Sequence, residues 1–162
     1  MTGPASGAAN TPEERLAALG MAVPPVAQPV ASYLPTARTG SLIYTAGQLP
    51  FVQGELPATG KVGAEISPEQ ATELARYCAL NVIAAIKAEI GELSRVTRIV
   101  KVVGFVASAP DFYGQPQVIN GASDLFSEVF GAAGKHARSA VGVAALPLNA
   151  PVEIEAIAEI AG

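Results

Sequence analysis

Two runs of alternating apolar residues near the C-terminus constrain the fold more than any other part of the chain. They cover residues 138–147 and 151–160, and a short segment rich in Pro and Asn joins them. Apolar residues at every second position are typical of β-strands, and Pro and Asn are typical of turns. We therefore predict an antiparallel hairpin. A tight turn would place Ala144 opposite Glu153, because antiparallel partners keep a constant index sum.

The two faces of this predicted hairpin differ in character. One face is almost wholly apolar and would pack under helices; it carries Ser139, Val141, Val143, Ala145, Val152, Ile154, Ala156, Ala158 and Ile160. The other face alternates small and charged side chains, with Arg138, Ala140, Gly142 and Ala144 beside Glu153, Glu155, Ile157 and Glu159. Small side chains allow a close approach, so we expect something other than solvent against this second face.

Sequence signals predict three helices in the rest of the chain. Residues 11–19 have a Thr cap, a Pro at the first helical position and a Glu three residues after the cap. Residues 67–90 begin with a second capping box and carry apolar residues at helical spacing. Residues 115–130 place apolar side chains on one face. A glycine follows each segment, which is typical of a helix end.

Strand signals complete the pattern. Residues 32–38 and 41–48 read as two strands around a Thr39-Gly40 turn, and residues 96–108 as a long strand central in a sheet. Residues 51–61 have Gly and Pro breaks typical of a loop or small hairpin. The order strand, strand, helix, strand, helix, strand, strand predicts an α+β fold, with two helices on one face of a mixed sheet.

Length and composition limit the domain organisation. At 162 residues, the chain has the size of one domain. Residues 1–10 are small and uncharged, which predicts a disordered tail, and residues 11–162 form a single predicted domain whose residues 11–30 are an N-terminal extension with a short helix. Half of the residues are apolar and none is Trp, which favours surface buried against other copies of the chain.

Charge and cysteine content exclude several partners and compartments. A net charge of −4 without a Lys or Arg cluster predicts no nucleic-acid or membrane partner. The single cysteine excludes an intrachain disulfide, and no signal peptide or long apolar run is present, so we expect a cytoplasmic protein. One His and one Cys cannot assemble a typical zinc site, so no metal is expected.

A longer motif resembles a known family. The run Ala137-Arg138-Ser139-x-Val141-x-Val143-x-x-Leu146-Pro147, followed by Glu153-Ile154-Glu155-Ala156-Ile157-Ala158, resembles the C-terminal signature of the YjgF/Rid (reactive intermediate deaminase) family. The likeness extends back through Asn120, the segment 45–50 and Tyr33, and the N-terminal extension resembles a longer subgroup. This resemblance implies a chorismate-mutase-like fold, a homotrimer, and hydrolytic deamination of small 2-imino or enamine acids to 2-keto acids. The residues themselves contain no phosphate-binding loop or other cofactor motif, so no cofactor is expected.

The resemblance also assigns site residues. Arg138 matches the arginine that binds the substrate carboxylate, and a planar guanidinium suits that role. From the residues alone, a structural salt bridge from Arg138 to Glu159 across the hairpin is the alternative. Glu153 matches the family's glutamate placed to hold or activate water, although a charged strand residue is usually simply solvated. The substrate-binding positions of the family correspond to Tyr33, Gly47, Asn120 and Ala140.

Several positions leave alternatives open. Ala140 stands where the family usually has cysteine, which excludes a thiol role there and puts substrate preference in question. Cys78 lies on the apolar stripe of the long predicted helix and is expected to be inert core. His136 could reach a pocket around Arg138 or could be structural. Two other functions stay possible: a trimer that binds small carboxylates without catalysis, and an endoribonuclease or translation inhibitor.

Overall fold

A computed structural model describes residues 11–26, 29 and 31–162, so the predicted disordered tail at residues 1–10 lies outside the described part. The described residues form a mixed five-stranded sheet in the order β1-β2-β5-β3-β4. The strands are β1 (Thr36–Thr39), β2 (Leu42–Thr45), β3 (Val96–Ala107), β4 (Ala137–Val143) and β5 (Val152–Ile160). The helices are α1 (Pro12–Ala18), α2 (Pro68–Ile90) and α3 (Gln115–Phe130), with short 3₁₀ turns at Leu93–Arg95, Gly131–Gly134 and Pro147–Asn149.

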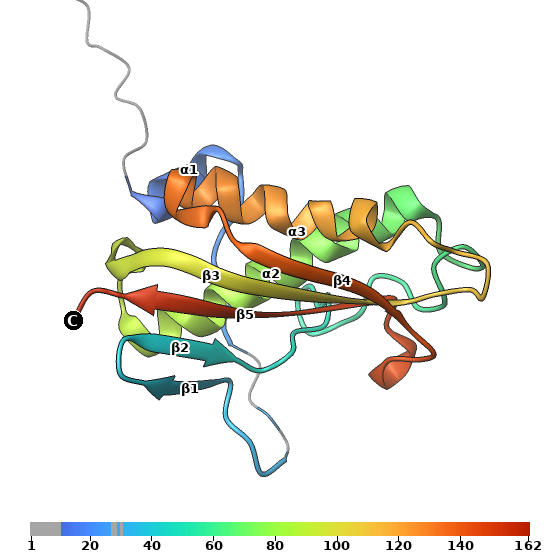
Figure 1. Cartoon of the computed structure of the whole chain (residues 1–162), viewed down its shortest axis with the longest axis horizontal. Helices are drawn as coiled ribbons and strands as arrows, with labels where there is room; N and C mark the ends of the chain where they lie inside the picture. The colour runs from blue at the N-terminus through green and yellow to red at the C-terminus, as the bar shows by residue number, and fades with distance from the viewer. Residues whose placement is uncertain (1–10, 27–28, 30) are drawn as a thin grey trace, which may run out of the picture.

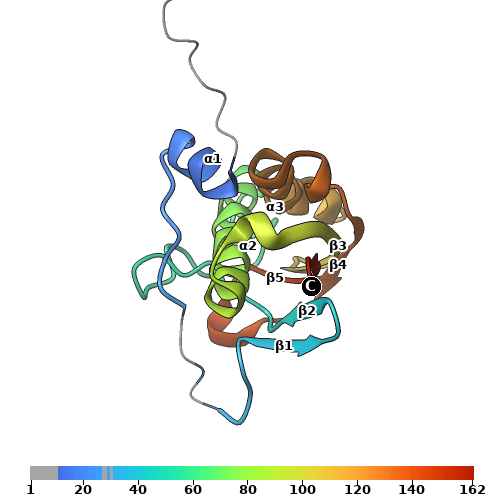
Figure 2. The same ribbon diagram turned by 90° about the vertical axis from the view of Figure 1, so that its left-hand side faces the viewer.

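The α+β class and the two helices on one face of the sheet are confirmed. Helices α2 and α3 pack together on one side of the strands, and α1 lies against α3 (Figures 1 and 2). The predicted caps form as well, because the hydroxyl of Thr11 accepts a hydrogen bond from the Glu14 amide, and the hydroxyl of Ser67 accepts one from the Gln70 amide. Among the described residues, no helix is long and apolar enough to span a membrane.

The N-terminal extension is docked onto the domain. One carboxylate oxygen of Glu13 accepts hydrogen bonds from the Leu93 amide at 2.7 Å and from the Lys87 ammonium at 3.0 Å. Leu16 is 1% exposed and belongs to the core. Helix α1 is therefore an integral part of the structure, whereas residues 27, 28 and 30 of the predicted N-terminal extension lie outside the described residues.

The predicted C-terminal hairpin is wrong. Strands β4 and β5 are not neighbours, because β3 lies between them, pairing parallel with β4 and antiparallel with β5. A parallel pair needs a long crossover connection, and helix α3 supplies it. The segment between β4 and β5 contains the Pro147–Asn149 turn, in which Leu148 has φ +60°. That segment carries the chain past β3 and not into a tight hairpin.

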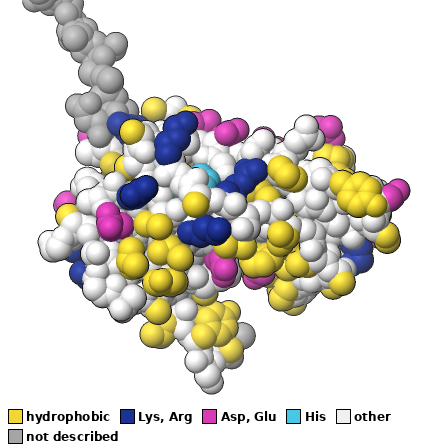
Figure 3. All heavy atoms as spheres, in the orientation of Figure 1, with side chains coloured by type: hydrophobic (Ala, Val, Ile, Leu, Met, Phe, Trp, Pro, Cys, Tyr) yellow, Lys and Arg dark blue, Asp and Glu magenta, His cyan; other side chains and the backbone are white. Residues whose placement is uncertain are grey.

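This correction changes which side chains share a face. Arg138 is paired with Val102 of β3, and Gly142 with Val106, so both point to the helix side of the sheet. Glu153 is paired with Phe105 and points to the open side. The predicted core face is therefore wrong for β4: Ser139, Val141 and Val143 lie on the open side, where Val141 is 44% exposed. Figure 3 views this side and shows hydrophobic side chains beside Lys and Arg over the strands.

The first two strands are shorter than predicted. Strand β1 begins at Thr36, so Tyr33 precedes it in a loop, and the turn to β2 is formed by Gly40 and Ser41, with Thr39 still in the strand. The region predicted as a loop or small hairpin contains one isolated antiparallel bridge between Val52 and Glu55. The loop position of Tyr33 matters for the site described below.

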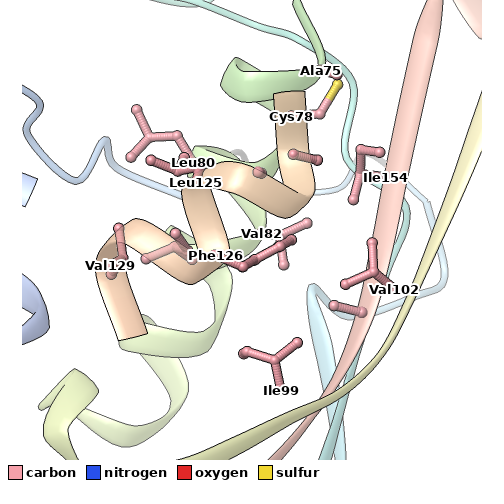
Figure 4. Close-up of a cluster of buried hydrophobic side chains, with 14 of the residues drawn as sticks. Ala75, Cys78, Leu80, Val82, Ile99, Val102, Leu125, Phe126, Val129 and Ile154 are labelled. Carbon is pink, nitrogen blue, oxygen red and sulfur yellow. The ribbon is translucent and has the colours of Figure 1, made fainter. Parts of the chain in front are cut away.

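The core lies between the helices and the sheet. Phe126 and Leu125 of α3 pack with Val82 of α2 and Ile99 of β3 (Figure 4), and all four are fully buried. The two helices approach closely at Gly121, where a Cβ atom would lie 2.0 Å from the Thr72 carbonyl oxygen. Only glycine allows this contact, and it holds α3 firmly over β3 and β4.

Candidate functional site

Arg138 is held by α3 and not by an acidic residue. Its Nη1 atom donates hydrogen bonds to Asn120 Oδ1 at 2.7 Å and to Ser123 Oγ at 3.3 Å. The alternative of a salt bridge to Glu159 is wrong, because Glu159 accepts instead from the Thr97 hydroxyl and Arg138 forms no ion pair among the described residues. Within those residues, Nε and Nη2 of Arg138 have no hydrogen-bond partner. One donor edge of the guanidinium is therefore available to an anion.

Ser123 and His136 extend this group of polar side chains. The Nδ1 atom of His136 donates to the Gly134 carbonyl at 2.6 Å, and Nε2 lies 2.9 Å from Ser123 Oγ. Burial lowers the pKa of His136, and the positive charges of Arg138 and Lys135 lower it further, although the hydrogen bond to Gly134 opposes them. The lowered pKa favours the neutral form of the imidazole. Figure 3 shows this side chain, in cyan, with Lys and Arg around it.

The sequence prediction missed Ser123 and left His136 undecided. Asn120 and Ser123 are three residues apart on a helix and therefore share a face. Because Asn120 was already a candidate site residue, this spacing could have indicated Ser123 as well. Their contact with Arg138 depends on how α3 packs on β4, which periodicity does not encode. The structure places His136 next to Ser123, which contacts Arg138.

Ala140 lies next to Arg138 along β4 on the same face. It is paired with Gly104 and is partly buried against the core. The methyl group offers no nucleophile and no hydrogen bond. The arginine side of the site is thus built from Arg138, Asn120 and Ala140 of the predicted residues, together with Ser123 and His136.

Glu153 belongs to a second group on the other side of the sheet. Residues 46–48 continue the sheet beside β5, because the Gln48 amide donates to the Ile154 carbonyl at 2.8 Å. The Glu153 carboxylate consequently lies over Gly47, where an added Cβ atom would be 2.6 Å from its Oε1. Partial burial raises the pKa of Glu153, and the negative charge of Glu155 raises it further. A carboxyl group with a raised pKa is better matched to proton transfer near neutral pH.

Tyr33 lies near this second group. It is 57% exposed in the loop before β1 and lines a depression of about 440 Å³ with Tyr44 and Ala46. The Ala46 amide donates to the Pro35 carbonyl at 2.8 Å, which fixes this loop beside the segment that contains Gly47. Gly47 and Glu153 form what we call the glutamate side of the site, and the loop that carries Tyr33 is tied to it through Ala46.

The structure does not bring the two sides together within one chain. Val102, the partner of Arg138, and Phe105, the partner of Glu153, are three residues apart on β3. Three residues along a strand and two strand spacings across give about 14 Å between the backbones of Arg138 and Glu153. Their side chains also leave opposite faces of the sheet. One small substrate in a single chain cannot contact both.

Two other features do not contribute to these groups. A cavity of about 560 Å³ lies between residues 22–26, the segment 48–54 and α2, but no titratable side chain and none of the predicted site residues line it. Among the described residues, no group of three or more His, Cys, Asp or Glu could hold a metal ion. Cys78 is fully buried, as predicted, and burial raises the pKa of its thiol well above the usual value, with the Glu153 charge as a smaller cause.

The fold and these residues agree with one family. Residues 13–160 match the family described as YjgF/chorismate mutase-like, putative endoribonuclease. The chain belongs to this family. It is 43% identical to protein TCP17 of Trypanosoma cruzi over 143 residues, covering 88% of this chain and 89% of that protein. It is 31% identical to 2-iminobutanoate/2-iminopropanoate deaminase of Dermatophagoides farinae, covering 86% and 94%.

A solved structure extends this comparison. Protein Atu1372 of Agrobacterium tumefaciens, described as of unknown function, superposes with a TM-score of 0.88 at 46% identity, covering 93% of this chain and 92% of that one. The similarity therefore includes nearly the whole chain. The resemblance of the C-terminal motif to the YjgF/Rid family is confirmed.

Proposed function

We propose that this protein hydrolyses small 2-imino or enamine acids to 2-keto acids and ammonia. The observation that carries the proposal is the Arg138 guanidinium, which is fixed on α3 through Nη1 and keeps its Nε and Nη2 donors unpaired. A planar pair of donors suits a carboxylate. The deaminase of Dermatophagoides farinae, 31% identical over most of the chain, supports an imino acid as the rest of the substrate.

Hydrolysis of the imine requires few protein groups once the substrate carboxylate is bound. Water adds to the imine carbon, forming a C–O bond, and a proton moves to the nitrogen. The hydroxyl proton of this adduct then moves to the nitrogen, the C–N bond breaks, ammonia leaves, and the carbonyl of the 2-keto acid forms. No electrons are gained or lost overall. Glu153 would accept the proton from water and return it to nitrogen, and its raised pKa suits both transfers. Arg138 would orient the substrate.

The two groups of site residues would meet between subunits of a homotrimer. Arg138 and Glu153 point to opposite faces of the sheet, so each needs its counterpart from another chain. Two surfaces support such an assembly. Strand β4 is an edge strand, which is prone to association when left open. Val141 and Tyr44 are 44% and 43% exposed, which is typical of an apolar contact surface.

The direct test is ammonia release from 2-aminoacrylate that is generated in the assay. Wild type should accelerate release over the spontaneous reaction, and Arg138→Ala should not. A folded, oligomeric wild-type protein that gives no acceleration with any small 2-imino acid would refute the proposal. The assay also shows whether Ala140, in place of the family's usual cysteine, is compatible with turnover.

A second candidate function is carboxylate binding without catalysis. The observation that favours it is Ala140, which lies beside Arg138 and offers no reactive group. This candidate predicts that 2-keto acids bind in an Arg138-dependent manner while ammonia release stays at the spontaneous rate. An endoribonuclease, as in the family's description, is disfavoured by the net charge of −4, and salt-dependent RNA binding would revive it.

A further inference from the structure

The hydrogen bonds around Arg138 run in one direction only. A carbonyl oxygen can only accept, so the Nδ1 atom of His136 carries the hydrogen that it donates to Gly134 at 2.6 Å. In the neutral ring, Nε2 is then an acceptor, and the Ser123 hydroxyl donates to it across 2.9 Å. The oxygen of Ser123 consequently turns a lone pair toward Arg138, whose Nη1 donates to it across 3.3 Å.

The two hydrogen bonds of Nη1 decide which edge of the Arg138 guanidinium is free. The two hydrogens of Nη1 lie in the guanidinium plane, and they are taken by Asn120 Oδ1 and Ser123 Oγ. Two acceptors on one nitrogen restrict the rotation of the guanidinium more than the bond to Asn120 alone would. The end-on pair, Nη1 with Nη2, is no longer available to a ligand. Only the side-on pair, Nε with Nη2, can take both oxygens of a carboxylate.

The imidazole ring is itself held in place. Gly134 is buried, and an added Cβ atom there would lie 2.2 Å from the Phe126 carbonyl oxygen, so the backbone that accepts from Nδ1 packs tightly on α3. The Phe126 ring meets the His136 ring edge to face, with centroids 5.9 Å apart and an interplanar angle of 78°. His136 therefore presents Nε2 to Ser123 from a rigid support.

We propose that Ser123 and His136 are positioning residues that turn the Nε–Nη2 edge of Arg138 toward the substrate carboxylate. His136 acts through Ser123 and touches no reacting atom. The inference rests on the proposed function in one respect, since it takes Arg138 as the group that binds the carboxylate. It adds to that function two residues outside the family motif with which the sequence was first compared.

The test measures the affinity of the full-length protein for 2-oxobutanoate, a stable 2-keto acid, by calorimetry. Ser123→Ala and His136→Phe should each weaken binding about tenfold, because each removes a hydrogen bond that fixes the guanidinium. His136→Gln should bind within about threefold of wild type, because its side-chain oxygen can accept from Ser123 near the position of Nε2. His136→Phe keeps a ring beside Phe126, so the Phe and Gln variants separate hydrogen bonding from packing.

Ser127→Ala is the matched control, because Ser127 is half-buried on the same helix, one turn beyond Ser123, and has no side-chain hydrogen bond among the described residues. It should bind as wild type does. If His136→Phe fails to fold, as judged by circular dichroism and oligomeric state, the comparison of Ser123→Ala with Ser127→Ala decides alone. Binding by Ser123→Ala within twofold of wild type would overturn the positioning role.

The outcomes for positioning and for deamination are separable. Weakened binding in Ser123→Ala, with no ammonia release by wild type, would support positioning and refute the proposed function. Normal ammonia release with unchanged affinity in Ser123→Ala would support the function and refute positioning. Absence of 2-oxobutanoate binding in wild type would overturn the carboxylate role of Arg138 and both proposals with it.

Discussion

Complementation between two inactive variants is the sharpest consequence of the sheet topology. Arg138→Ala removes the arginine side of the site, and Glu153→Ala removes the glutamate side. Because these side chains leave opposite faces of the sheet, a site shared between neighbouring subunits can be intact in a mixed trimer although neither chain is complete. Each variant alone should release ammonia at no more than a few per cent of the wild-type rate.

The expected recovery follows from counting. In the proposed ring of three subunits, each site would take Arg138 from one chain and Glu153 from the next. When the two variants assemble at random from an equal mixture, about one site in four receives both intact residues. The mixture should therefore regain about a quarter of the wild-type activity per site, and the recovery should fall as either variant is made scarce.

The assay requires subunit exchange, so the two variants are unfolded and refolded together or co-expressed with different tags. Native mass spectrometry confirms that mixed trimers have formed, and mixing the folded variants without exchange serves as the control. Mixed trimers that form and stay as inactive as their parents would refute the inter-subunit site. That result would require both residues to act within one chain, against the opposite faces that they occupy here.

Three further predictions test single residues. Arg138→Lys should lose most activity although the charge is kept, because an ammonium cannot reproduce two parallel donors; activity within about twofold of wild type would contradict the carboxylate role. Glu155→Gln should move the acidic limb of the pH profile of kcat/KM to lower pH, because removing a neighbouring negative charge lowers the pKa of Glu153; an unmoved limb would assign it to another group. Cys78→Ala should lower the free energy of unfolding by about 1 kcal/mol, measured by denaturant titration, with unchanged turnover per folded protein.

The helices could be predicted closely because their signals are local. The hydroxyls of Thr11 and Ser67 cap α1 and α2 as the sequence indicated, and α3 begins and ends at the predicted Gln115 and Phe130. A capping box or a terminal glycine acts within one helical turn, so neighbouring residues carry the whole signal. The order of the elements follows from the same kind of information, and with it the fold class.

Strand pairing could not be predicted in this way. Periodicity shows that residues 137–143 and 152–160 are strands, but not which strands flank them, and adjacency in sequence favoured a hairpin that does not form. Ser123 was missed for a related reason, because its role depends on the packing of α3 over β4. Arg138 and Glu153 were chosen as candidates through the family motif, because periodicity alone does not distinguish them from other charged strand residues.

The predicted hairpin and the observed sheet differ in whether Arg138 and Glu153 share a face of the sheet. The predicted hairpin pairs residues whose numbers sum to an odd value, so Arg138 would face Glu159 and share a face with Glu153. In the structure, Val102 pairs with both Arg138 and Ala156, so Arg138 points to the same face as Ala156. Glu153 is an odd number of residues from Ala156 on β5, so it points to the opposite face. A shift of one residue reverses every side chain of a strand. The hairpin would have separated the two residues along one face, whereas the observed sheet places their side chains on opposite faces as well as about 14 Å apart along the sheet. Arg138 keeps its Nε and Nη2 donors unpaired among the described residues, and Glu153 lies on the face without helices, so each can meet its counterpart only from a second copy of the chain.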